Sequence, residues 1–198
     1  MRLVCNMKTI TLILTLATAV ALSSAFGARK EKSEASPTEA KASAAEIKAS
    51  TAENKESAAD TAFIKKAADG GMTEVELGKI AEKNGEKEDV KSFGSHMVKD
   101  HGKANDELKS VASKMNVTVP EKVSAEHQAK IDKMSKLSGA AFDTAYAKEM
   151  VAAHEKTIAT FEAAKGKVGN EDLKKFIDDT LPVIKEHLEM AKKMQTAK

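Results

Sequence analysis

The sequence contains no tryptophan, one tyrosine, three prolines and one cysteine among its 198 residues. Aromatic and β-branched runs, which are typical of strands, are scarce, whereas Ala, Lys, Glu, Leu and Met are abundant, and this composition favours helices. The single cysteine, Cys5, lies in an N-terminal segment that we expect to be cleaved off. We therefore expect neither a disulfide nor a cysteine metal ligand in the mature chain.

An apolar run long enough to cross a bilayer, about 20 residues, is also missing from the sequence. Arg2 and Lys8 precede an uncharged stretch, Thr9–Phe26, whose most apolar part is the shorter segment Ile10–Leu22. A short apolar segment after basic residues, ending in small residues, predicts a secretory signal peptide over residues 1–27. We expect an exported, periplasmic protein, and an uncleaved membrane anchor is the alternative.

A charge excess of one sign is absent from the predicted mature chain. Two of the 32 basic residues, Arg2 and Lys8, belong to the predicted signal peptide, so 30 remain against 30 acidic residues. This balance lacks the basic excess with which proteins neutralise phosphates, so we expect no nucleic-acid partner. We also expect no stable membrane span after cleavage, and a protein partner or an oligomer stays open.

Residues 28–60 contain almost no large side chains. A seven-residue repeat runs through them as KASAAEI, KASTAEN and KESAADT. Alanines alternate at spacings of three and four, as in a coiled coil, but alanine buries too little area to offset the entropy lost on ordering. We predict a flexible or weakly helical linker here, with a coiled coil as the alternative, and a folded domain over residues 61–198.

Four long amphipathic segments and one short one follow. The predicted helices are Thr61–Asn84, Glu86–Met115, the short Glu121–Leu137, Ala140–Lys165 and a last helix beginning near Asn170. The long connection between the second and third long helices can return the chain to the other end of a bundle, so these two helices would run parallel. The sequence thus predicts an all-α, ferritin-like four-helix bundle with a long crossover that carries a short extra helix.

Each long helix places one polar side chain with a metal-binding atom on its apolar face. The four residues are Glu74, His101, His154 and His187. Counted from the predicted helix starts, the first three lie at mid-height and His187 lies about one turn away. One carboxylate and three imidazoles form a ligand set suited to Fe, Zn or Cu. The candidates for groups that orient these ligands are Asp100, Glu155, Glu186 and Tyr146.

Two other interpretations of these four residues stay open. The first is a buried hydrogen-bond network without metal, with Glu74 accepting from imidazole N–H groups, in a structural or partner-binding module of the cell envelope or stress response. The second is a metal-dependent oxidoreductase. Di-iron bundles use two Glu-x-x-His pairs, and no histidine here has a glutamate three residues before it, which counts against the second interpretation. No catalytic residue is assigned.

Two methionines, Met97 and Met150, each precede a histidine by four residues. Thioethers are ligands for Cu(I), which is one interpretation of this spacing. Methionine at helical spacing is also a common core residue, and we favour that interpretation.

Four strings carry a resemblance to a known family: GGMTEVELGKIA, VKSFGSHMVKDHGKANDEL, LSGAAFDTAYAKEMVAAH and TLPVIKEHLEMA. They closely resemble an exported bacterial, ferritin-like domain of unknown function, family 4142. The similarity covers Phe63 to Lys192 and omits the linker. Its one departure is Gly94, where the family more often has alanine, and we expect this glycine to loosen the second helix without touching the site. The resemblance implies the fold and export, and it implies no activity.

Overall fold

The computed structural model describes residues 37–196, with the side chains of residues 58–196. That part of the chain forms five α-helices and no strand. The helices are α1 (Pro37–Asn84), α2 (Glu88–Lys114), α3 (Ala125–Met134), α4 (Gly139–Lys165) and α5 (Glu171–Thr196). The all-helical prediction is confirmed. The predicted signal peptide lies outside the described residues.

The first helix is longer than predicted. It begins at Pro37 rather than Thr61, so it runs through residues 37–60 of the predicted linker. Proline suits the first position of a helix, where its missing N–H has no partner to lose, and the alanine-rich repeat that follows has high helix propensity. The short helix α3 starts at Ala125 rather than Glu121. The hydroxyl of Ser124 caps it by accepting the backbone N–H of His127 at 3.3 Å.

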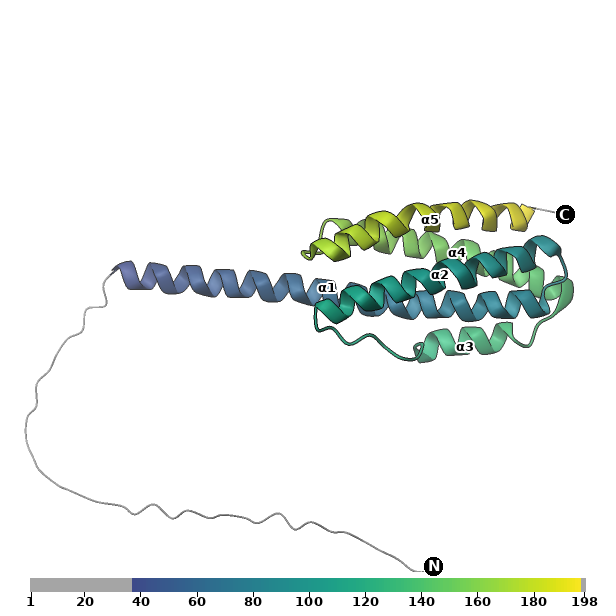
Figure 1. Ribbon diagram of the computed structural model, residues 1–198, viewed down its shortest axis with the longest axis horizontal. Coiled ribbons are helices and arrows are strands. Elements are labelled where there is room, and N and C mark those ends of the chain that lie inside the picture. Colours follow the sequence, from purple (N-terminus) through teal and green to yellow (C-terminus); the bar gives the residue numbers. More distant parts are fainter. Residues whose placement is uncertain (1–36, 197–198) are drawn as a thin grey trace, which may run out of the picture.

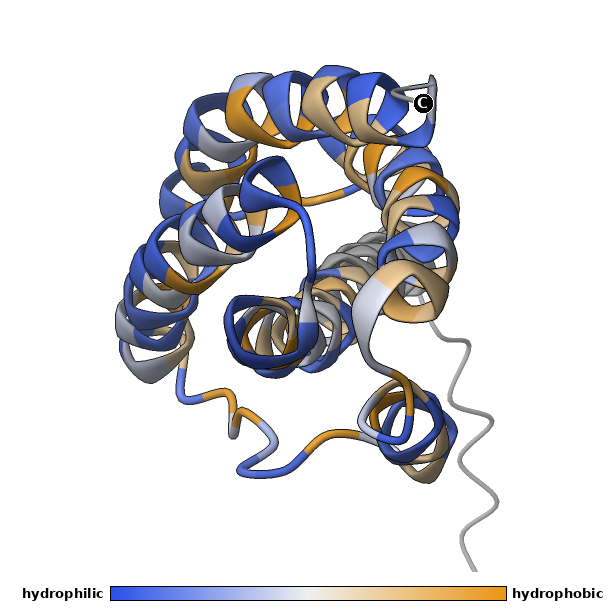
Figure 2. Ribbon diagram, turned by 90° about the vertical axis from the view of Figure 1, so that its right-hand side faces the viewer, coloured by the Kyte–Doolittle hydropathy of each residue, from blue (hydrophilic) through white to orange (hydrophobic). Residues whose placement is uncertain are grey.

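The four long helices form two antiparallel hairpins, α1–α2 and α4–α5 (Figure 1). The connection through α3 brings the chain back, so α4 runs in the same direction as α2, as predicted. Both α2 and α4 pack against α1 and against α5, and Figure 2 places them on opposite sides of the bundle. The two parallel helices are therefore diagonal to each other in the bundle.

Each hairpin supplies a buried carboxylate that caps the second helix of the other hairpin. Asp143 on α4 accepts the backbone N–H groups of Glu86 and Lys87, both at 3.0 Å, just before α2 begins. Asp60 on α1 accepts the two backbone N–H groups just before α5 at 2.9 Å and 3.2 Å. Negative charge at a helix N-terminus is stabilising because it satisfies N–H groups that lack a partner within the helix.

These two caps belong to a repeat in the sequence. The string DTAF at Asp60 recurs as DTAY at Asp143, and EDVKSF at Glu88 recurs as EDLKKF at Glu171, so both pairs of strings have the same separation along the chain. The capped N–H groups have this same separation along the chain: those of residues 86 and 87 correspond to those of residues 169 and 170. The two hairpins are therefore related by an approximate two-fold repetition of sequence and contacts.

The apolar core consists of two clusters at different heights in the bundle. One gathers around Phe161 and the start of α5, and the other around Phe93 and the start of α4. On every long helix the buried member of the predicted set Glu74, His101, His154 and His187 falls between a member of one cluster and a member of the other. On α4, for example, His154 lies between Met150 and Phe161. A polar layer therefore separates the two halves of the core.

Helices α1 and α2 touch backbone to backbone at a pair of glycines. A Cβ atom added to Gly94 would lie 2.7 Å from the carbonyl oxygen of Gly78, and one added to Gly78 would lie 2.6 Å from the carbonyl oxygen of Gly94. Gly94 thus permits a close helix crossing. This crossing was not predicted from the sequence, because it joins residues of two helices.

Within residues 37–196, no helix combines the length and the apolar character that a membrane crossing requires.

Candidate metal centre

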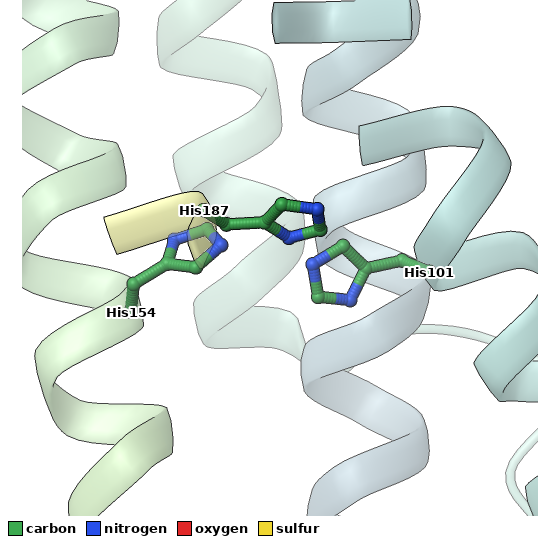
Figure 3. Close-up of side chains that lie close together, drawn as sticks. All are labelled: His101, His154 and His187. Carbon is green, nitrogen blue, oxygen red and sulfur yellow. The ribbon is translucent and has the colours of Figure 1, made fainter. Parts of the chain in front are cut away.

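Three histidines meet in the polar layer from three different helices. His101 comes from α2, His154 from α4 and His187 from α5, and Figure 3 shows their rings facing one another. Their ring centroids lie 5.3–5.8 Å apart, and one nitrogen of each lies within 4.8 Å of the other two. His187 is therefore level with the others and not one turn away. Counting from helix starts misplaced it, because helix starts in a bundle need not be level.

Hydrogen bonds from two of the rings fix which nitrogen carries the hydrogen. The Nδ1 of His154 lies 2.8 Å from the carbonyl oxygen of Met150. A carbonyl can only accept, so Nδ1 donates and Nε2 keeps a free lone pair. The Nε2 of His187 lies 3.1 Å from the Oδ2 of Asp100. An ionised carboxylate likewise only accepts, which leaves the lone pair on Nδ1 of His187. This is the arrangement by which proteins orient histidine ligands of metals.

Three other ring nitrogens have no hydrogen-bond partner in the described part of the chain. They are His101 Nε2, His154 Nε2 and His187 Nδ1, and all three are buried. Buried polar atoms without a hydrogen bond are uncommon because each costs about 1–3 kcal/mol. Three such nitrogens on neighbouring rings are a set of atoms that can bind one metal ion.

The electrostatics keep these rings neutral at ordinary pH. Burial, together with the charges of the other two histidines, lowers the pKa of His101 to about 3. Burial also lowers the pKa of His154 to about 4, although its bond to Met150 acts in the opposite direction. The pKa of His187 is lowered by burial too, and Asp100 opposes the shift. Neutral imidazole is the form that binds metals.

The predicted orienting groups behave differently from one another. Asp100 touches His187 across the helix interface, not its sequence neighbour His101. Glu155 and Glu186 are exposed. Tyr146 is fully buried, its ring stacks on Phe142 at 5.2 Å, and its hydroxyl has no hydrogen-bond partner among the described residues.

Glu74 is buried in the same layer, yet its carboxyl oxygens are not among the atoms that cluster with the three nitrogens. Its Oε2 has no hydrogen-bond partner among the described residues. Burial raises its pKa to about 8, with Glu149 raising it and Lys130 lowering it. The carboxyl group is therefore mostly protonated at neutral pH. The imidazole hydrogen bonds go to Met150 and Asp100, so the network in which Glu74 accepts from the rings does not form.

A cavity of about 100 Å³ lies beside Glu74 and His101. Apolar groups from all four long helices line most of it, and polar groups are added by Asn105 and Thr157. The lining also includes Lys66, Lys130 and Lys156.

Two further features bear on this centre. Met97 and Met150 are fully buried members of the apolar cluster around Phe93, so they act as core residues. The ring of Phe93 lies 6.1 Å from that of His187 and 6.2 Å from that of His154. The sequence does not predict this contact, because helical spacing gives the face on which a residue lies and not its partners.

The fold and the geometry define an all-helical protein with a buried cluster of three histidines. A family model matches residues 41–194, and the chain belongs to that family, which is described as a domain of unknown function (DUF4142). The match begins inside the segment predicted as a linker, so it is longer than the similarity of the four strings. No curated protein and no solved structure matches the chain.

Proposed function

We propose that this chain is an exported, ferritin-like helical bundle that binds one transition-metal ion through His101, His154 and His187. The observation that carries the proposal is the set of three unpartnered, buried nitrogens. Imidazole is an ordinary ligand of zinc, copper and iron. A metal ion would supply the electron-pair acceptor that all three nitrogens lack.

The distances and the surroundings support a metal in this position. Histidine nitrogens bind zinc at about 2.0–2.1 Å, so nitrogens within 4.8 Å of one another need only small side-chain movements to reach one ion. Two of the three rings are already held in the required tautomer by Met150 and Asp100. Three protein ligands leave one position of a tetrahedral ion free, as in catalytic rather than purely structural zinc sites.

Metal binding to the whole mature chain tests this proposal. After chelator treatment, calorimetric titration with Zn²⁺ and separately with Cu²⁺ should give one ion per chain. The substitution His101→Ala should weaken binding by more than about 100-fold, because loss of a group that only orients a ligand already costs 10–100-fold. The matched control is His96→Ala, since His96 lies on the same helix and is exposed.

Two results would overturn the metal proposal. One is a wild-type chain that takes up no stoichiometric metal, which would favour the structural or partner-binding alternative. The other is a His101→Ala chain that binds as tightly as the His96→Ala control.

The proposed export is supported by the short apolar segment that follows Lys8. Expression of the full chain in a bacterial host, followed by N-terminal sequencing of the periplasmic fraction, should give a protein beginning at Ala28. A full-length protein retained in the cytoplasm would contradict export and leave the metal proposal untouched.

A further inference from the structure

The internal repeat shows what stands at the positions equivalent to the polar layer. Equivalent residues are separated along the chain by the distance between Asp60 and Asp143. By this rule Gly71 is equivalent to His154, and Ala104 is equivalent to His187. Ile184 is likewise equivalent to His101, and Thr157 to Glu74. All four counterparts line the cavity of about 100 Å³. The cavity therefore occupies the place where a second set of polar side chains would stand if both hairpins carried one. Glycine and alanine stand there in place of two histidines, and the side chain of Asn105 lies beside Gly71.

The cavity also adjoins the metal centre, because Glu74 and His101 line it. Phe93 packs against the rings of His154 and His187 and belongs to one apolar cluster. Leu108 and Ile184, which line the cavity, belong to the other cluster. Phe93 thus covers His154 and His187, and His101 borders the cavity.

The size and charge of the cavity limit what it can hold. A dry cavity of about 150 Å³ binds benzene, so about 100 Å³ has room for a molecule of only a few heavy atoms. Three of its lining residues are lysines: Lys66, Lys130 and Lys156. Of the two glutamates in the lining, Glu149 is paired with Lys130 at 2.5 Å, and Glu74 is mostly protonated at neutral pH because its pKa is raised to about 8. Such a basic lining attracts anions.

We propose that a small monoanion, of the size of azide or formate, enters this cavity and takes the free coordination position of the metal, with the carboxyl group of Glu74 beside it. This inference rests on the proposed metal site. The anion donates an electron pair to the metal, and no electron is transferred and no covalent bond is broken. The unpartnered Oε2 of Glu74 is available to hydrogen-bond the anion. Because the pKa of Glu74 is raised, its carboxyl group has a hydrogen to donate.

The test uses the full mature chain loaded with one equivalent of Cu²⁺ and titrated with sodium azide at constant ionic strength. Azide bound to Cu²⁺ should give a saturable charge-transfer absorption and a changed electron paramagnetic resonance spectrum. Ala104→Leu fills the cavity and should abolish this response while Cu²⁺ stoichiometry stays at one. Ala163→Leu, at an exposed position of α4, is the matched control and should respond like the wild type.

Two substitutions of Glu74 define its role. Glu74→Gln keeps a hydrogen-bond donor and should bind azide about as well as the wild type. Glu74→Leu removes the donor and should weaken azide binding by about tenfold or more, the value of one hydrogen bond to a charged group. If Glu74 itself occupied the free position, Glu74→Gln would instead strengthen azide binding, and that result would overturn the inference.

The outcomes separate this inference from the proposed function. A chain that binds Cu²⁺ stoichiometrically but shows no saturable azide response retains the metal site and overturns the anion site. An equal response in the Ala104→Leu and wild-type proteins also overturns it, because the anion would then reach the metal by another route. A chain that binds no metal overturns both.

Discussion

The two helical hairpins share a plan and differ at the centre. Both begin with an Asp-Thr-Ala-aromatic string, and each aspartate caps the second helix of the other hairpin. At the middle of the bundle, however, α4 and α5 contribute two histidines, whereas α1 and α2 have Gly71 and Ala104 at the equivalent positions. The framework is thus repeated and the site is not. The hydrogen bonds that cap the helices therefore follow the repeat, and the histidines of the candidate site do not.

The largest expected effect is the loss of stability when one of the two repeated aspartate caps is removed. Asp143→Ala should lower the free energy of unfolding by about 2–4 kcal/mol, because it leaves two backbone N–H groups without their acceptor. Asp60→Ala should cost a similar amount, since its two bonds are equivalent. Urea denaturation measures both values, with the exposed Asp106→Ala as the control. A cost confined to one of the two aspartates would break the equivalence of the hairpins.

The second effect is the stabilisation of the folded chain by a metal ion. The ion would bind the three histidines, which come from both hairpins and do not follow the repeat. An ion that binds only the folded chain should stabilise it by about 2.7 kcal/mol when its free concentration is 100 times Kd. Thermal melts of the zinc-loaded chain should show this gain, and chelator should remove it. In His187→Ala the loaded and chelated proteins should melt together. A metal-dependent gain that persists in that variant would place the ion elsewhere.

The third effect compares the crossings within the hairpins. The counterparts of Gly78 and Gly94 are Phe161 and Ile177, so only α1 and α2 approach at glycines. Gly94→Ala should cost about 1–3 kcal/mol, as expected for overpacking against backbone. A Cβ atom at Gly102, on the same helix, would meet nothing within 4 Å. Gly102→Ala should therefore add up to about 1 kcal/mol of helix stability. Urea denaturation of both variants tests this contrast, and equal effects would contradict it.

The smallest effect is the pH dependence of the metal-free chain. The depressed pKa values of His101 and His154, about 3 and about 4, mean that the unfolded state binds more protons below pH 6.5, so stability falls on acidification. The pKa of Glu74, raised to about 8, means that the folded state binds more protons between pH 4.5 and 8, so stability falls as pH rises through that window.

These opposed slopes should give the metal-free chain a stability maximum near pH 6.5, the ordinary pKa of histidine. At about 1.4 kcal/mol per proton and pH unit, His101 and His154 together outweigh Glu74 on the acid side by roughly 1 kcal/mol per pH unit, and the lowered pKa of His187 adds to this fall. Glu74→Gln should abolish the alkaline fall and steepen the acid one. Urea denaturation between pH 5 and 8 measures both slopes. A flat profile in the wild type would show that these groups are not buried.

Helical spacing predicted much of this structure. Apolar residues recurring every three or four positions marked the four long helices, and the same spacing put His101, His154 and His187 on inward faces. It could not give their heights, because these depend on how the helices are set against one another. Helical spacing also could not identify the partner of Asp100. Its carboxylate contacts His187, which lies on another helix and far along the sequence.

The caps were not predicted, although a signal for them existed. Asp60 and Asp143 look like ordinary polar residues near helix starts, and their partners lie in the other hairpin, far away along the sequence. The repeated strings around them would have marked these positions as equivalent. Glu74 shows the opposite case. Its position on an inward face was correctly identified, but spacing alone could not show that its carboxyl oxygens stay outside the nitrogen cluster.

The exchange of caps has a consequence for the order in which the chain acquires its structure. The start of α2 at Glu88 needs Asp143, which is synthesised only after the whole of α2 and α3. The first hairpin therefore stays incomplete until the second has started to form, and the second draws on a residue already present in the first. Each hairpin supplies the carboxylate that caps a helix of the other. We therefore expect the two hairpins to fold and unfold together, in one cooperative event.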